Sequence, residues 1–168
     1  MRPAIATTET PRGFGTLLSR KAPEFPLDRA MPLVRALGRG FERDDPRAAF
    51  PPACSLLGLG TGLTPSGDDL VGGALFATRF LARSDPRWTK LAKELCREAR
   101  SRSHVVSAAL FSDLAAGLSF APLHEIATAL SVGADQEALS AARALVAIGH
   151  SSGWDMLAGF LIGIRKAR

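Results

Sequence analysis

The chain has 168 residues, of which 46% are hydrophobic, and its formal net charge is +5 at pH 7. This composition is too apolar for a disordered chain and is sufficient for one compact domain. No apolar run approaches the ~20 residues that cross a bilayer, and the start lacks the apolar stretch of a signal peptide, so we expect a cytoplasmic protein. The basic residues are scattered, and no aromatic residues lie between them. The high pI is therefore the only feature of the sequence that favours nucleic-acid binding.

Proline is concentrated in the first third of the chain, where eight of the eleven prolines precede residue 53. Because proline blocks helix interiors, we predict an arm or loop over residues 1–24 and a charged linker over residues 39–53. A short helix is expected between them, around Asp28–Leu37 and ending at Gly38. Residues 1–53 are thus expected to be a Pro/Arg-rich arm and linker with one short helix, and the first 24 residues to add little to the core.

Residues 54–168 are predicted to form the helical domain, because apolar residues recur there at helical spacing. In the clearest segment, Arg87–Arg100, the apolar residues share one face and the lysines and glutamates lie opposite. A short strand near Ala53–Leu59 is the one β element expected, since no segment shows sustained strict alternation. Further helices are expected at Val105–Ala116, at Pro122–Leu130 and from Asp135 to about Ile148, each followed by a glycine that suits a helix end.

Two segments, Gly67–Ala82 and Gly153–Ile164, are apolar around almost their whole circumference. A helix without a polar face is typical of the centre of a bundle. We therefore predict an all-α helical bundle in which these two helices are the most buried.

The same short pattern opens both central segments, 86 residues apart. Each copy reads S-G-x-D-x-φ-x-G, where φ is aliphatic, and the copies begin at Ser66 and Ser152. The repetition predicts that the two central helices are related by an internal pseudo-repeat. Gly73 and Gly159 hold equivalent positions, so we expect the helices to approach each other there, where a side chain would push the backbones apart.

Each copy has a purely structural interpretation. A serine followed three residues later by an acid forms a capping box, which satisfies free N–H groups at the start of a helix. This interpretation accounts for Ser66 with Asp69, and for Ser152 with Asp155, without any ligand. It describes a non-catalytic structural subunit whose motifs only cap and pack two central helices.

A binding site is the competing interpretation, because capping does not require the glycine-rich run Gly58–Gly62 before the first copy. Glycines let a loop present backbone N–H groups, and a helix N-terminus attracts anions. We predict that Ser66 and Ser152 converge and that the loop closes a small polar pocket for a phosphate or carboxylate. The expected ligand-binding residues are Gly60, Thr61, Gly62, Thr64, Ser66, Gly67, Asp69, Ser151, Ser152 and Asp155.

Asp68 and His150 are the candidate catalytic residues. Asp68 is surplus to the cap, so it is free to bind a metal ion, orient an amine or face water, and His150 is a candidate proton donor. The glycine run lacks the lysine of a Walker loop and the βαβ context of a dinucleotide fingerprint. We therefore expect no cofactor and no defined metal site, and a small anionic metabolite as the ligand.

The stretch Gly58–Asp69, G-L-G-T-G-L-T-P-S-G-D-D, resembles the signature of a bacterial family that includes the AllH-type subunit of oxamate carbamoyltransferase. The stretch Gly149–Gly159 is similar to that family's second motif, and the likeness runs from Cys54 to the C-terminus. The resemblance implies a subunit of a complex that transfers a carbamoyl group between carbamoyl phosphate and oxamate in allantoin breakdown. It also implies partner subunits, with a homo-oligomer as a further option. Members usually have a longer N-terminal region than this chain has.

Overall fold

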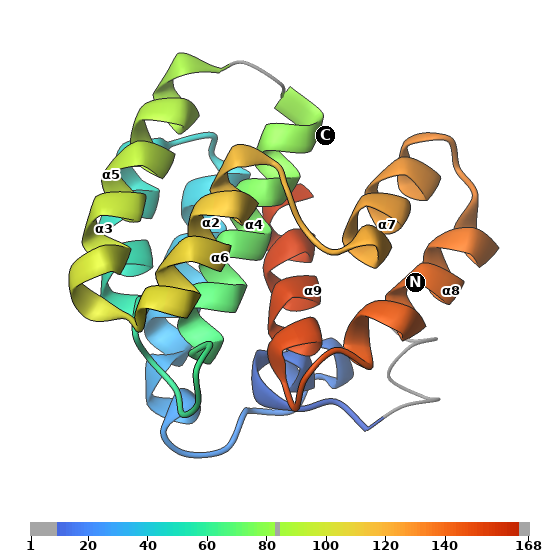
Figure 1. The fold of residues 1–168 in the computed structure, drawn as a ribbon, viewed down its shortest axis with the longest axis horizontal. Helices are drawn as coiled ribbons and strands as arrows, with labels where there is room; N and C mark the ends of the chain where they lie inside the picture. The colour runs from blue at the N-terminus through green and yellow to red at the C-terminus, as the bar shows by residue number, and fades with distance from the viewer. Residues whose placement is uncertain (1–9, 83–84, 165–168) are drawn as a thin grey trace.

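The computed structural model of the protein describes residues 10–82 and 85–164, and these residues form helices joined by turns (Figure 1). Two short 3-10 helices come first, η1 (Gly13–Ser19) and η2 (Leu27–Ala30). The α-helices are α2 (Met31–Glu42), α3 (Pro46–Leu56), α4 (Ser66–Ala82), α5 (Pro86–Arg102), α6 (Val105–Ala116), α7 (Ala121–Ser131), α8 (Asp135–Val146) and α9 (Ser152–Gly163). The predicted all-α fold is confirmed.

The helices expected after residue 86 are all present, and their ends follow from local chemistry. Helix α5 begins after Asp85, whose side chain accepts a hydrogen bond from the backbone N–H of Arg87. Helix α6 ends at Gly117, which has a left-handed φ of 86° and donates its N–H to the last turn of the helix. Such caps depend on residues close in sequence, which is why periodicity and glycine positions were sufficient to predict these helices.

The predicted linker over residues 39–53 is wrong, because α3 occupies most of it and runs across residue 53. Asp45 caps this helix, because its side chain accepts hydrogen bonds from the backbone N–H groups of Arg47 and Ala48. Pro51 and Pro52 lie inside the helix and remove two backbone donors. Burial of the face that carries Ala49, Ala53 and Leu56 offsets that loss. The same helix replaces the strand expected near Ala53–Leu59.

The described part of the predicted N-terminal arm also differs from expectation, while residues 1–9 lie outside the described residues. Phe14, in η1, is fully buried in the core, and its backbone N–H donates to Asp155 Oδ1 at 2.6 Å. Gly15 lies against Trp154, where an added Cβ would come within 2.7 Å of that side chain. The prediction that residues 1–24 add little to the core is therefore wrong, because η1 docks on α9.

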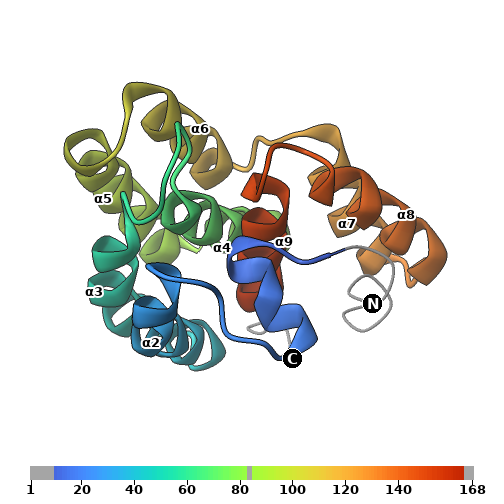
Figure 2. The ribbon, with the colours of Figure 1, turned by 90° about the horizontal axis from the view of Figure 1, so that it is seen from below.

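The two central helices are α4 and α9, as predicted. Every residue from Ser66 to Thr78 and from Gly153 to Gly163 is buried. Figures 1 and 2 show α4 and α9 side by side in the middle, with α2, α3, α5 and α6 on one side and the hairpin of α7 and α8 on the other. Each central helix is apolar around almost its whole circumference, and neighbouring helices cover it on all sides.

The central helices approach most closely at the predicted glycines. A Cβ on Gly73 would collide with the carbonyl oxygen of Met156, and a Cβ on Gly159 would collide with the carbonyl oxygen of Leu70. Leu70 and Met156 are themselves 86 residues apart, so the two contacts are reciprocal. This reciprocity supports the predicted internal repeat.

The starts of the central helices are held by matched contacts as well. The backbone N–H of Gly67 donates to Leu59 O at 2.9 Å, and that of Gly153 donates to Ile148 O at 3.1 Å. Each of these glycines also lies against a carbonyl oxygen in the last turn of the preceding α-helix, α3 or α8. Both helix starts are therefore packed so tightly that only glycine fits.

The stretch Val105–Ser131 is long and apolar enough, by composition, to be a membrane-span candidate. In the structure it is divided by the turn at Gly117 into α6, of 12 residues, and α7, of 11 residues. Each helix is shorter than the ~20 residues that a bilayer requires.

Candidate functional site

A cavity of about 730 Å³ lies between the two motifs. The N-terminal segments around Arg12 and Phe25 form its other walls. The predicted convergence of the two helix starts is therefore present in the fold. The cavity is lined by eight of the predicted site residues, Gly60, Thr61, Gly62, Thr64, Ser66, His150, Ser151 and Ser152.

The glycine-rich loop forms one edge of this cavity. Gly58, Gly60 and Gly62 all have positive φ, at 77°, 121° and 99°, which is backbone that other residues rarely adopt. A Cβ on Gly60 would lie 2.7 Å from the backbone nitrogen of Ser66. Glycine at this position lets the loop fold back over the start of α4.

Hydroxyl groups join the two motifs. Thr64 Oγ1 and Ser152 Oγ lie 2.9 Å apart, within hydrogen-bonding distance. Burial raises the pKa of both Asp69 and Asp155, and hydrogen bonds from the other motif oppose that rise, from Ser152 at Asp69 and from Ser66 at Asp155. Each serine thus acts on the aspartate of the other motif, so the cap predicted within each copy does not describe their interactions. In α9 the N-cap is Ser151, and its side chain forms no cap hydrogen bond.

Asp69 and Asp155 are buried acids at the crossing of the central helices. Burial, and then the nearby charge of Asp155, raise the pKa of Asp69 to about 8. Burial raises the pKa of Asp155 to about 7, against the hydrogen bonds from Ser66 and from the backbone of Phe14. In both residues the Oδ2 atom is buried and has no hydrogen-bond partner among the described residues. A substantial fraction of both carboxyl groups is therefore protonated near neutral pH.

Asp68 has a different environment from the one expected. Its Oδ1 accepts from the backbone N–H of Gly58 at 2.8 Å, and its Oδ2 accepts from the Ser107 hydroxyl at 2.5 Å. Asp68 is 2% exposed, so it fastens the glycine loop and α6 to α4. Within residues 10–82 and 85–164, no group of three or more His, Cys, Asp or Glu side chains could hold a metal ion. The geometry gives Asp68 a structural position and leaves Asp69 and Asp155 as the carboxyl groups with an unpartnered oxygen.

The backbone donors at the helix starts are largely occupied. Besides Gly67 and Gly153, the N–H groups of Asp68 and Asp155 donate to carbonyl oxygens of Pro65 and Ser151. Gly67 therefore has no free N–H for a ligand, in contrast to the role predicted for it. The donors that remain at the cavity include side-chain hydroxyls and the cationic group described next.

Arg12 is the site residue that the sequence did not indicate. Its Nη1 lies 3.1 Å from His150 Nδ1 and 3.4 Å from the carbonyl oxygen of His150. The segment of η1 thus brings a guanidinium to the cavity beside the second motif, 138 residues further along the chain. A single arginine in a proline-rich segment carries no local signal of this position.

Comparison with known proteins identifies the motif-bearing region. A family model described as "Oxamate carbamoyltransferase subunit AllH" matches residues 56–164, which include both motifs and all the helices from α4 to α9. No curated protein and no solved structure matches the chain.

Proposed function

Because this chain belongs to the AllH family of oxamate carbamoyltransferase subunits, we propose that the cavity between its two motifs binds a small carboxylate or phosphate ligand of that complex. The observation that carries the proposal is the convergence of both motifs on one cavity together with Arg12. Carbamoyl phosphate and oxamate are the candidate ligands, and the complex is expected to work in the cytoplasm with partner subunits.

The electrostatics of the cavity support an anion. Arg12 supplies a full positive charge, and Thr64, Ser66 and Ser152 supply hydroxyl donors. Partial protonation of Asp69 and Asp155 reduces the negative charge behind those hydroxyls. The dipole of each central helix adds a partial positive charge at its start, reduced where its N–H groups are bonded to carbonyl oxygens.

The part played by this subunit in the reaction is positioning. Carbamoyl transfer requires that donor and acceptor be held in contact and that charge on the oxygens be stabilised. The hydroxyl pair and Arg12 are suited to fixing one anionic substrate. His150, beside Arg12 at the rim, keeps its proposed role as proton donor, whereas Asp68 is held by Gly58 and Ser107 and keeps no role in the reaction.

A structural role is the second candidate function. The occupied N–H groups of Gly67 and Gly153 and the contacts of Gly73 and Gly159 show that much of each motif serves packing. On this alternative the chain is a scaffold for the partner subunits, and the polar cavity contains water alone.

Thermal unfolding in the presence of ligands separates the two functions. Oxamate, carbamoyl phosphate and inorganic phosphate are each added in excess, since a ligand at 100 times its Kd stabilises the folded state by about 2.7 kcal/mol. We expect a rise in Tm for at least one of them, and loss of that rise in Arg12→Gln. Arg143→Gln, which changes an exposed arginine of α8, is the matched control. Three ligands without effect on the wild-type Tm would favour the scaffold.

A further inference from the structure

A second cavity lies behind the hydroxyl pair of the first. Its volume is about 460 Å³, and it shares Thr64, Gly149 and Ser152 with the polar cavity. The contact between Thr64 and Ser152 is therefore part of a wall between two spaces of different chemistry. Most of the second cavity is apolar, with walls formed by Leu110, Leu114, Leu118, Phe120, Ile148 and Met156.

Asp69 is the buried polar group of this second cavity. The residue is 5% exposed, it lines the cavity, and its Oδ2 has no hydrogen-bond partner among the described residues. A buried polar atom without a partner destabilises the fold, so a group that supplies the missing hydrogen bond gains affinity. This is the feature of the cavity that points to a ligand.

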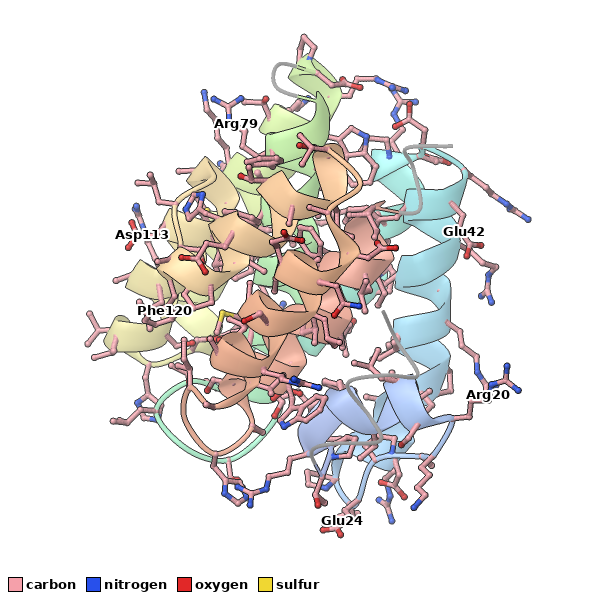
Figure 3. The ribbon with its side chains drawn as sticks, turned by 90° about the vertical axis from the view of Figure 1, so that its right-hand side faces the viewer. Arg20, Glu24, Glu42, Arg79, Asp113 and Phe120 are labelled. Carbon is pink, nitrogen blue, oxygen red and sulfur yellow. The ribbon has the colours of Figure 1, made fainter. Side chains whose placement is uncertain are left out.

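The charges around the second cavity exclude an anion. The ionisable residues that line it are Asp69 and Asp113, and none of the described lining residues is a cation. Asp113 is exposed at the rim, and Figure 3 shows it on the same edge of the molecule as Phe120. A carboxylate or phosphate would meet hydroxyl groups and two acids here but no cation, whereas in the first cavity it meets Arg12.

We propose that this second cavity binds a neutral ligand with an apolar body and a primary amide head, and that the amide bonds to the Asp69 carboxyl group. The apolar walls take the body, and the amide meets the oxygen that lacks a partner. This site differs from the anion site of the proposed function, because Asp69 does not line the first cavity, although the two cavities share Thr64, Gly149 and Ser152.

The protonation state of Asp69 suits an amide. The acids that face it are Asp155 and Asp68, and the hydroxyls of Ser152 and Thr64 lie beside it. With a pKa of about 8, its carboxyl group is mostly protonated at pH 7. A protonated carboxyl group has one O–H donor and one carbonyl acceptor, and a primary amide offers the complementary acceptor and donor. The unpartnered Oδ2 can therefore form a hydrogen bond with the amide, as donor or as acceptor.

Pentanamide, pentanoate and toluene are suitable probes, because they share an apolar body and differ in the head group. Binding is followed at pH 7 by NMR of the methyl groups of Leu114 and Met156, which line the cavity. We expect pentanamide to bind at least about tenfold more tightly than pentanoate, since one hydrogen bond to a buried polar group is worth about a factor of ten. Equal affinity of the two, or shifts confined to methyl groups elsewhere, would overturn the proposal.

Substitution at Asp69 gives the second test. Asp69→Leu keeps the size of the side chain and removes the carboxyl group, so pentanamide should lose about tenfold in affinity while toluene binding is retained. Asp113→Asn makes a similar change at the exposed rim and should leave both affinities unaltered. Should Asp69→Leu fail to fold, Asp69→Ala replaces it with the same expectations. Undiminished pentanamide binding in the folded Asp69 variant would show that the amide does not contact Asp69.

Discussion

The hydroxyl oxygens of Thr64 and Ser152 lie 2.9 Å apart and join the loop before α4 to the first turn of α9. This contact lies between residues 88 positions apart and forms the wall between the two cavities. This contact joins the two motifs through side chains, whereas at the crossing of α4 and α9 the two backbones are in direct contact.

The first prediction tests that link. In a double-mutant cycle of Thr64→Val and Ser152→Ala, we expect a coupling free energy of about 0.5–1.5 kcal/mol in chemical unfolding, the range of a part-buried hydrogen bond. Thr128→Val combined with Ser140→Ala, on exposed helix positions, is the control pair and should give no coupling. Additive effects of Thr64→Val and Ser152→Ala would mean that the contact contributes nothing to stability.

The second prediction concerns the glycine crossing. Gly73→Leu and Gly159→Leu should each destabilise the fold by at least ~1–3 kcal/mol, because the new Cβ meets a backbone carbonyl that cannot move aside. Ala144→Leu, at an exposed position of α8, is the control and should be almost neutral. Neutral behaviour of both glycine variants in urea unfolding would contradict the close approach of α4 and α9.

The third prediction distinguishes the neighbouring aspartates. Asp68→Asn should lower the free energy of unfolding by about 1–3 kcal/mol, since Asp68 accepts from both Gly58 N–H and the Ser107 hydroxyl and an amide has one oxygen to accept them. Asp69→Asn should instead stabilise the protein at pH 8 and above, because it removes a buried negative charge that has an unpartnered oxygen. If Asp69→Asn proved less stable than Asp68→Asn, the structural role would belong to Asp69 and not to Asp68.

The fourth prediction is a pH dependence. The pKa of Asp69 is raised from 3.8 to about 8, so between pH 4 and pH 8 the folded state holds a proton that the unfolded state has released. Stability from this group is therefore greatest at low pH and falls as pH rises through that window. The difference in unfolding free energy between wild type and Asp69→Asn should change accordingly, in favour of the variant at high pH. A difference that stays constant from pH 4.5 to pH 8.5 would show that Asp69 titrates normally.

The fifth prediction concerns η1. Phe14→Ala should destabilise the fold by about 3–5 kcal/mol, the usual cost of truncating a fully buried phenylalanine. Phe25→Ala, at a side chain that is 70% exposed, is the matched control and should cost much less. Similar midpoints of thermal unfolding for the two variants would restore the expectation that this segment is a dispensable arm.

The helices were predictable where the signal is local. Periodicity, glycine ends and the lack of polar faces were sufficient to define α4 to α9, and the repeated motif was sufficient to place the crossing at Gly73 and Gly159. The sequence does not predict helix α3, because proline normally breaks a helix, whereas here the Asp45 cap and a buried face stabilise it.

The site was only partly predictable, since side-chain roles depend on partners far along the chain. The convergence of the two motifs followed from their similarity. The docking of Phe14 on Asp155 joins residues 141 positions apart, and the bond from Ser107 to Asp68 spans 39. Neither pairing has a pattern in the sequence. Only the fold shows that Arg12 lies beside His150, that Asp68 is fully bonded and that Asp69 has an unpartnered oxygen.

The central claim, that the cavity between the motifs binds a small anion, is tested most directly by titrating the 15N-labelled protein with oxamate and following its backbone amides by NMR. We predict saturable shifts of the amides of Gly60, Thr61 and Gly62 and of His150, with weaker binding in Arg12→Gln and unchanged binding in Arg143→Gln. Amides that stay unshifted in the glycine loop at saturating oxamate and at saturating carbamoyl phosphate, or shifts confined to surfaces away from both motifs, would contradict the claim.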